Sequence, residues 1–427
     1  MLLSIKNINF TDQTSKISIV WSIKFKNMIL RQQYIEQLIA LKDTNLIKVL
    51  TGVRRCGKST IMQMFKDYLL KNGVSEKQIV FLNFEDLDNE IWLKNYKGLY
   101  KEIIGRLDPQ KKSYVFLDEI QQVEEFERLI DGLYVKPNID VYITGSNAYL
   151  LSSELGTLLT GRYISIHVLP FSFKEFLYTQ PENARTDLMF NKYLVTGGMP
   201  GIFELPDFAV QNYIQEVIQN IIQKDILVRY NWRNEDHFNK TTAFLFDSIG
   251  SVISPKKITN ILRTENAISL SHNTVGNYIN ALTEAYLFYK VKRYDLQGKA
   301  LLATQQKYYS VDLGFKKYYL SDKANLDLGH NLENVVFLEL LRRGYRVNIG
   351  KAGNTEVDFV VRNPKGNMEY IQVAWTAKEK NTYEREIKSF ELIKDFNKRT
   401  LITSDVEPIT YFNGIKKTNI IDWLLNE

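Results

Sequence analysis

The sequence has a single cysteine, Cys56, and only four histidines in 427 residues. One cysteine excludes an internal disulfide framework and a cysteine-rich zinc site, and it fits a reducing cytoplasm. No two histidines have the His-x-x-x-His spacing, so zinc catalysis is disfavoured as well. No stretch approaches the roughly 18 consecutive apolar residues that a membrane-spanning helix needs. The sequence therefore predicts a cytoplasmic protein without a membrane segment.

The remaining composition is that of a folded chain of several domains. Hydrophobic residues make up 44%, charged residues 24% and aromatic residues 12% of the sequence, which excludes disordered and fibrous architectures. At roughly 150 residues per domain, the length corresponds to about three domains. The net charge of +6 is uneven, because residues 240–310 hold nine lysines and arginines against four acidic residues. This local surplus is a weak pointer to a polyanionic partner.

The first part of the chain alternates strand-like and helix-like patterns. Apolar runs at residues 46–51, 78–84, 113–117 and 141–144 predict strands, and residues 60–70 and 124–134 have helical periodicity between them. This alternation predicts a parallel sheet wrapped by helices over residues 28–175. Residues 1–27 are interpreted as an extension outside that domain.

The rest of the chain divides into three regions. Residues 176–239 lack strand signals and predict a helical lid or linker. Residues 240–320 show three helical patterns followed by a strand, a turn and a second strand, which is the layout of a winged-helix domain. Residues 321–427 combine a helix at 332–342 with strands at 345–349, 356–362 and 370–374, and they predict a final α/β domain.

The strongest local signal is the segment Gly52-Val53-Arg54-Arg55-Cys56-Gly57-Lys58-Ser59. It fills every fixed position of the pattern G-x-x-x-x-G-K-[ST], between a predicted strand and a predicted helix, which is the context of a phosphate-binding loop. The two glycines let backbone N–H groups turn inward around an anion, and the helix after the loop adds its dipole. Lys58 would reach the terminal phosphates and Ser59 would bind Mg²⁺. The residues predicted to contact the nucleotide are Gly52, Val53, Arg54, Arg55, Cys56, Gly57, Lys58, Ser59 and Thr60.

Two carboxylates, Asp118 and Glu119, follow the strand predicted at residues 113–117. Acids at this place complete a phosphate-binding loop: Asp118 would hold the Mg²⁺, and Glu119 would act as general base toward an attacking water. Such a base favours hydrolysis over phosphoryl transfer to a small acceptor. The alternative is that the pair only caps a helix N-terminus.

Three further features each have two interpretations. After the strand at 141–144, either Ser146 or Asn147 senses the terminal phosphate or orients the water, unless both only close a turn. Arg162 is either a trigger arginine, acting in cis or toward a neighbouring subunit, or a solvated surface residue. Cys56 lies near a helix N-terminus, which would acidify its thiol, but a packing role is the favoured interpretation. The residues predicted to be catalytic are Lys58, Glu119, Asn147 and Arg162.

These motifs resemble those of a prokaryotic family of AAA+-like ATPases with a C-terminal domain of unknown function. The resemblance covers nearly the whole chain after Met28, and it rests on residues 47–60, 81–86, 115–121, 143–148, 159–163, 170–177, 197–200, 307–314 and 332–359. It implies that the cofactors are ATP and Mg²⁺ and that ATP is hydrolysed, and it implies no biological role. AAA+ relatives often form rings, so the resemblance also suggests a homo-oligomer. The supporting residue is Arg162, which would act on the site of a neighbouring subunit.

The helix predicted from Ser271 within residues 240–320 is amphipathic. Val275, Ile279 and Leu282 recur at helical spacing and would face the core, which leaves Tyr278 and the polar residues on the outer face. That composition is typical of a recognition helix, and basic residues of the following hairpin would bind phosphates. The alternative is that this domain contacts no DNA and serves as a packing domain that relays the ATP state of the ATPase domain. The residues predicted to contact DNA are His272, Asn273, Asn277, Lys290, Lys292 and Arg293.

The last domain resembles a restriction-endonuclease-like fold. Glu356 and Asp358 are two residues apart on one strand and therefore point to one face, where they would share a second metal with Glu333 and Gln372. Active nucleases of this kind place a lysine two residues after the position of Gln372, where this chain has Ala374. That departure argues against cleavage and favours a retained fold that serves recognition.

Taken as a whole, the sequence predicts an ATP-driven conformational switch. Mg-ATP would bind the P-loop domain, slow hydrolysis would change its contacts with the winged-helix domain, and residues 240–427 would engage a DNA or protein partner. The alternative is an ATP-controlled enzyme that binds or cuts DNA with the C-terminal acids. A third hypothesis is a regulatory module that binds ATP and barely turns it over.

Overall fold

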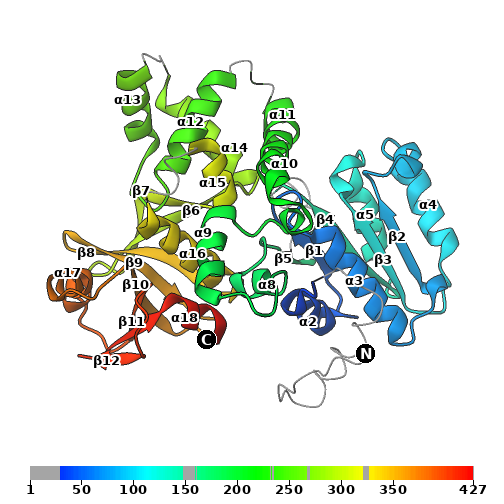
Figure 1. The fold of residues 1–427 in the computed structure, drawn as a ribbon. Coiled ribbons are helices and arrows are strands. Elements are labelled where there is room, and N and C mark those ends of the chain that lie inside the picture. Colours follow the sequence, from blue (N-terminus) through cyan, green and yellow to red (C-terminus); the bar gives the residue numbers. More distant parts are fainter. Residues whose placement is uncertain are drawn as a thin grey trace.

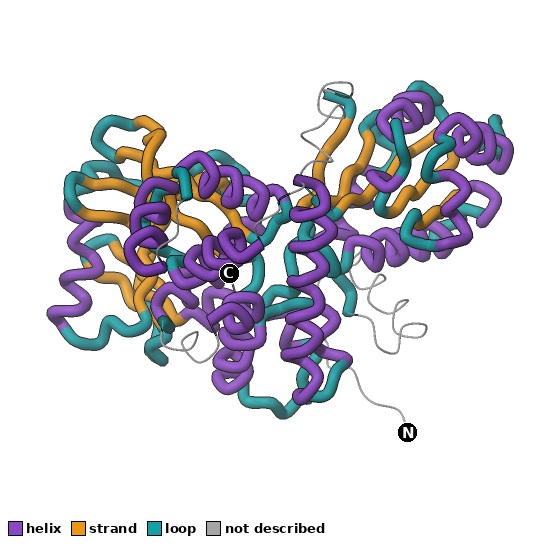
Figure 2. Tube along the Cα trace, turned by 90° about the horizontal axis from the view of Figure 1, so that it is seen from above, coloured by secondary structure: helices purple, strands orange, loops and turns teal. Residues whose placement is uncertain are grey.

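The computed structural model describes residues 29–147, 159, 161–230, 232, 235–266, 270–320 and 327–426. The expected N-terminal extension, residues 1–27, lies outside the described residues. Two β-sheets stand at opposite ends of the molecule, and a group of helices lies between them (Figure 1). Figure 2 shows the same division from above, with the strands in two separate groups.

The first sheet is parallel, with the strand order β2-β3-β4-β1-β5. Its strands are β1 (Ile47–Thr51), β2 (Ile79–Asn83), β3 (Ser113–Asp118), β4 (Ile139–Gly145) and β5 (Tyr163–His167). Helices α2 (Gln32–Leu41), α3 (Lys58–Lys71), α4 (Tyr96–Arg106) and α5 (Phe126–Tyr134) accompany it, with short turns η1 (Glu76–Gln78), η2 (Leu87–Trp92) and η3 (Ile120–Gln122). The expected parallel α/β sheet is confirmed, and the edge strand β5 is an addition that the sequence analysis missed.

Both faces of this sheet are covered, which explains why its central strands β1, β3 and β4 are buried along their whole length. Successive residues of a strand point to opposite faces, so Leu50 belongs to the core shared with α3 and the middle of the chain. Its neighbour Val49 belongs to the separate core beneath α4 and α5.

The middle of the chain is helical, as expected for residues 176–239. It contains α8 (Phe173–Leu177), α9 (Thr186–Thr196), η4 (Pro200–Glu204), α10 (Asp207–Asn220), the π-helical turn η5 (Ile221–Leu227) and α11 (Val228–Tyr230). The connection after α9 requires glycine: Gly197 has φ +73°, and a Cβ there would lie 1.8 Å from Oδ1 of Asp312. Asp312 accepts hydrogen bonds from the N–H groups of Gly198 and Gly314, and burial raises its pKa to about 7.

The expected three helices and hairpin follow in order. They are α12 (Glu235–Asp247), α13 (Pro255–Asn266), α14 (His272–Glu284), β6 (Phe288–Asp295) and β7 (Ala300–Ser310), and α15 (Leu313–Leu320) comes after them. The hairpin is not a free wing, because β6 pairs in parallel with β8 (Arg346–Ala352) of the second sheet. The helices and hairpin fit the winged-helix hypothesis, and the further pairing of β6 is an addition to it.

The second sheet is mixed and has the strand order β12-β13-β11-β10-β9-β8-β6-β7. Its remaining strands are β9 (Thr355–Arg362), β10 (Met368–Ala374), β11 (Lys398–Thr403), β12 (Thr410–Phe412) and β13 (Ile415–Asn419), and its helices are α16 (Leu328–Arg342), α17 (Lys380–Glu391) and α18 (Ile420–Asn426). The predicted α/β character of the C-terminal region is confirmed. No helix in the described part of the chain has the length and apolar character needed to span a bilayer.

Candidate functional site

The P-loop joins the carboxyl end of β1 to the start of α3, where the motif predicted it. Its backbone needs glycine: Gly57 has φ +101°, and a Cβ on Gly52 would lie 2.2 Å from the carbonyl oxygen of Val168. Arg55 also has a positive φ, +65°, which costs energy for a residue with a side chain. The loop is therefore held in a tight, strained curl directly before a helix N-terminus, a geometry that suits anion binding.

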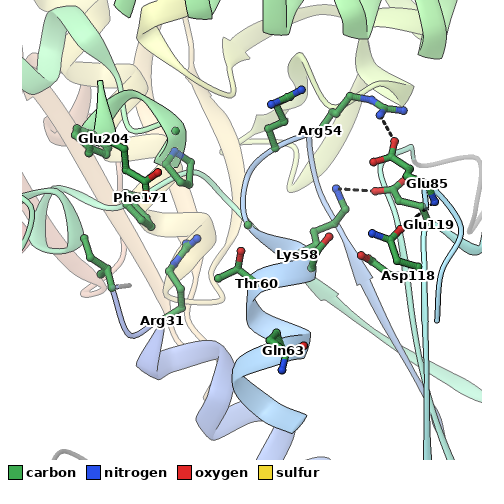
Figure 3. Close-up of a pocket in the computed structure, with 18 of the residues that line it drawn as sticks. Arg31, Arg54, Lys58, Thr60, Gln63, Glu85, Asp118, Glu119, Phe171 and Glu204 are labelled. Atoms are coloured by element: carbon green, nitrogen blue, oxygen red, sulfur yellow. Dashed lines mark hydrogen bonds and ion pairs between the residues drawn. The ribbon is translucent and has the colours of Figure 1, made fainter. Parts of the chain in front are cut away.

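Lys58 lies across this curl. Its Nζ donates to the carbonyl oxygens of Gly52 at 3.0 Å and Val53 at 3.3 Å, and it lies 3.7 Å from Oε1 of Glu119. The side chain is almost fully buried, at 3% exposed. Figure 3 shows Lys58 and Glu119 pointing toward each other across the site. The lysine thus links the loop to the acidic end of β3.

Asp118, the last residue of β3, is buried beside the loop. Thr144 of the neighbouring strand β4 donates its hydroxyl to Oδ1 of Asp118 at 2.5 Å, and the Ser59 hydroxyl also hydrogen bonds to this carboxylate. Burial raises the pKa of Asp118. A serine hydroxyl next to a buried carboxylate is a donor set that fits a magnesium ion with phosphate oxygens, so these two residues fit the predicted metal.

Glu119 follows with an unusual backbone, φ +53°. Its carboxylate accepts a hydrogen bond from the Ser146 hydroxyl at 3.1 Å and another from Gln121. Glu119 occupies the N-cap position of η3, yet its side chain makes no capping hydrogen bond. The capping interpretation of this acidic pair therefore finds no support, since both carboxylates are committed to the site.

Ser146 and Asn147 have different surroundings at the end of β4. Ser146 contacts Glu119, as described above, whereas the Asn147 side-chain amide donates to the carbonyl oxygen of Asp225 at 3.4 Å. Between these two sequence candidates, Ser146 is therefore the one bonded to the acid. The catalytic role of Asn147 stays a prediction.

Arg162 is far from this chemistry. It directly precedes β5, and its carbonyl accepts from the N–H of Ile47 at the start of β1, whereas the P-loop follows the other end of β1. Its guanidinium pairs with Asp131 at 2.6 Å on the surface, both side chains being more than 40% exposed. A strand of five residues spans roughly 17 Å, so the position of Arg162 does not support the cis alternative. Action toward a neighbouring subunit stays a prediction.

Cys56 packs inside the loop and is fully buried. Its Sγ lies 3.3 Å from the carbonyl oxygen of Val168, and burial raises the pKa of its thiol. The alternative of a thiol acidified by the helix is therefore not supported, because burial outweighs the nearby positive charges. The packing role is the one the contacts support.

Arg31 is a supporting residue that sequence reasoning missed. This buried side chain donates to the carbonyl oxygens of Cys56 at 3.1 Å and Leu169 at 2.8 Å, and it pairs with Glu175 at 2.6 Å. It therefore fixes the P-loop from outside. A lone arginine before the first predicted strand carries no local signal for this role.

A cavity of about 1700 Å³ runs along the loop. On one side it is lined by Asp118 and Glu119, and on the other by Phe171, which stacks on Phe203 with ring centres 5.6 Å apart. Figure 3 shows the loop between these two walls. Helix α10 and the turn η5 contribute Tyr213, Asn220 and Lys224 to the lining.

The second predicted metal site is not supported. Glu333, Glu356 and Asp358 do come together, but around Nζ of Lys307, at 2.9, 2.6 and 3.7 Å. Gln372 accepts from the backbone N–H of Asp358 at 3.3 Å. Within the described residues there is no group of three acidic, histidine or cysteine side chains placed to hold a metal. The expectation of a metal here is wrong, because a lysine ammonium occupies the centre of the cluster.

The predicted DNA-contacting residues have mixed exposure. His272, Asn273 and Asn277 are exposed on α14, and Lys290 and Lys292 are exposed on β6. Arg293 is half-buried and donates to Gln305 at 2.7 Å. Tyr278 is buried against the rings of Trp232 and Phe238, so its expected place on the outer face is wrong. The DNA contacts expected of these residues stay predictions.

Comparison with known proteins gives family matches over most of the chain. Residues 44–177 match an AAA domain, and residues 188–326 match a domain of unknown function (DUF8612). An uncharacterized protein of Haemophilus influenzae is 38% identical over 405 residues, which cover 94% of this chain and 99% of that protein. An uncharacterized protein of Methanocaldococcus jannaschii is 32% identical over 397 residues, which cover 88% of this chain and 85% of that protein.

Two solved structures are also similar. A Walker-type ATPase of Pyrococcus abyssi aligns with a TM-score of 0.49 and 14% identity, covering 68% of this chain and 96% of that one. AMPPCP-bound DnaA of Aquifex aeolicus aligns with a TM-score of 0.30 and 14% identity, covering 59% and 86%. At these scores neither likeness carries an argument about this chain.

Proposed function

This chain belongs to the AAA+-like P-loop ATPase family that includes the Haemophilus influenzae protein, and from that premise we propose that it binds Mg-ATP in the cavity and hydrolyses it. The observation that carries the proposal is the meeting of Lys58, Asp118 and Glu119 in one cavity at the P-loop. Lys58 comes from the P-loop, and Asp118 and Glu119 come from the end of β3. Together they are the groups that phosphoryl transfer to water requires.

Each residue has a definite task in this proposal. The loop N–H groups and Lys58 bind the phosphates. Ser59 and Asp118 would hold the magnesium ion, whose charge would offset that of the phosphates. Glu119 accepts the proton of the attacking water, and Ser146 and Gln121 orient its carboxylate. Phe171 and Phe203 offer an apolar wall for the base of the nucleotide.

We further propose that ATP turnover serves as a conformational switch. The supporting contacts run from the sheet to the rest of the chain: Thr51, directly before the P-loop, hydrogen bonds to His167, which in turn hydrogen bonds to Tyr289 of β6. A change in the loop would therefore act on the hairpin and on the sheet that continues from it.

Phosphate release tests the proposal. Lys58→Ala is expected to abolish ATP binding and turnover. Glu119→Gln keeps the size of the side chain but removes the base, so it is expected to retain ATP binding and to lower turnover by about 10²–10⁴-fold. Glu125→Gln, on the exposed surface, is the matched control and should turn over ATP like the wild type. Equal rates in the wild type and both site variants would reject the ATPase.

A further inference from the structure

Arg54 of the P-loop ties the loop to the helix above it. Its Nε and Nη2 each lie 3.2 Å from a different carboxylate oxygen of Asp225, which makes a bidentate pair, and its Nη1 donates to Glu85 at 2.6 Å. The Arg54 and Asp225 side chains are only 12% and 10% exposed. Figure 3 shows Arg54 reaching toward the acidic side of the site, where Glu85 receives it.

Asp225 lies in the π-helical turn η5, which continues α10. Such turns are rare and frequently occur at functional sites. The other face of this turn is anchored, since Ile221, Ile222 and Ile226 are buried in the same hydrophobic core as Leu50. A change in the ion pair of Asp225 is therefore expected to displace the whole helix rather than one side chain.

The helix in turn contacts the C-terminal half of the chain. Gln219 at the end of α10 lies within hydrogen-bonding distance of Tyr318 on α15, at 3.4 Å between Nε2 and the phenol oxygen. Helix α15 follows β7, the strand that carries Lys307. Arg54 is thus separated from the second sheet by a short series of packed elements.

Arg55, another cation that lines the cavity, lies over the ring of Tyr213 on α10 at 6.0 Å and forms no ion pair within the part of the chain that the structure describes. Lys58 donates to the loop carbonyls, and Arg31 fixes the loop from outside. Among the cavity-lining cations of the described residues, Arg54 is the one whose ion pairs join the P-loop to the helix above. A guanidinium presents the same two-pronged donor set to phosphate as to carboxylate.

We propose that Arg54 exchanges Asp225 and Glu85 for the terminal phosphate of a bound nucleoside triphosphate, so that this residue distinguishes a triphosphate from a diphosphate. This proposal rests on nucleotide binding at the P-loop. A triphosphate carries more negative charge than either carboxylate, so it competes for the guanidinium. The Asp225 side chain is only 10% exposed and burial raises its pKa, so its charge depends on Arg54 for compensation. When Arg54 binds the phosphate, Asp225 loses its partner, and the helical segment of α10 and η5 that carries Asp225 is then expected to shift.

Calorimetric titration with a non-hydrolysable ATP analogue and with ADP tests this role. Arg54→Ala is expected to weaken the analogue about tenfold or more, which corresponds to about 1.4 kcal/mol, and to change the ADP affinity less than about threefold. Asp225→Asn removes the competing charge, so it is expected to strengthen the analogue more than ADP. Arg106→Ala, which removes an exposed ion pair, is the matched control.

The double variant Arg54→Ala/Asp225→Ala guards against misfolding, because Arg54→Ala alone leaves a buried carboxylate without its partner. It is expected to show the same reduced preference for the analogue over ADP. Equal weakening of both nucleotides by Arg54→Ala and by the double variant would overturn the proposal and make Arg54 a general loop support. If the wild type binds neither nucleotide, or if Lys58→Ala binds both normally, it is the proposed ATP binding that fails.

Discussion

His167 shows how a single buried side chain connects separate elements. Its Nδ1 lies 3.2 Å from the Thr51 hydroxyl and its Nε2 lies 2.6 Å from the Tyr289 hydroxyl, so the ring joins β1, β5 and β6. Burial lowers its pKa from 6.5 to about 4. The folded protein therefore holds this ring neutral in a pH range where the unfolded chain would protonate it.

The pH dependence of stability follows from that difference. Between pH 6.5 and 4 the unfolded state binds the proton and the folded state does not, so stability falls as the pH falls, by about 3 kcal/mol over the whole interval. Asp312 acts in the opposite direction, because its raised pKa favours the folded state at low pH. Urea unfolding of the wild type and of His167→Gln at several pH values separates the effect of His167 from that of Asp312, since both proteins contain Asp312. The variant should lose less stability on acidification.

His272→Gln is the control for that series, because His272 is exposed on α14. Its pH profile should follow the wild type. A His167→Gln profile parallel to that of the wild type would contradict the assignment of a buried, neutral ring.

At the scale of single elements, α14 and β6 present a polar and basic surface. His272, Asn273 and Asn277 are exposed on the helix, and Lys290 and Lys292 are exposed on the strand. Two lysines that contact phosphates would release about two counterions on binding a duplex. The two lysines therefore predict a measurable salt dependence of nucleic-acid binding.

We expect the protein to bind duplex DNA with an affinity that falls as salt rises. Lys290→Ala/Lys292→Ala should weaken binding at low salt and make the slope of log affinity against log salt shallower by about 2. Fluorescence anisotropy with a labelled duplex measures both quantities. Lys101→Ala/Lys111→Ala, on the P-loop domain, provides a charge-matched control. An unchanged slope in the first variant would remove these lysines from any DNA surface.

At the scale of the whole molecule, the second half does not separate at residue 320. Strand β6 pairs with β8 through Arg293, Tyr294 and Asp295, and Lys307 of β7 is surrounded by carboxylates that come from α16 and β9. One hydrophobic core also extends from Leu50 of the first sheet to Ile402 of the second. The domain boundaries drawn from sequence remain predictions, and the boundary at 320/321 crosses a hydrogen-bonded sheet.

A chain that ends at residue 320 is therefore expected to misfold. It would leave the edge of β6 unpaired and Lys307 buried without its acids, and both are destabilising. Size-exclusion chromatography and near-UV circular dichroism should show aggregation or loss of fixed tertiary packing. A chain that begins at Met28 is the comparison and should stay monodisperse. A cooperative, native-like fragment 1–320 would contradict this account.

The residues of the candidate nucleotide site could be found in the sequence because their pattern is local. The P-loop motif lies within eight consecutive residues, and Asp118 and Glu119 follow a strand whose end must lie at the same edge of a parallel sheet. The parallel sheet itself followed from the alternation of strands and helices. The residue patterns of strands and helices and the conformation of the loop depend on residues that are neighbours in the sequence. The sequence by itself therefore determined both.

The tertiary structure decided what depends on distant partners. Arg31 meets Glu175 across 144 positions and Arg54 meets Asp225 across 171, and no periodicity encodes such pairs. Strand β10 has Ala374 where active nucleases of this kind place a lysine, yet Lys307 of β7 lies among the acidic side chains of Glu333 and Glu356. Arg162 has the residue type of a trigger arginine but lies at the wrong end of the sheet. Charged groups pair with whatever the fold brings within a few ångströms, because burying a charge alone costs more than any local preference provides.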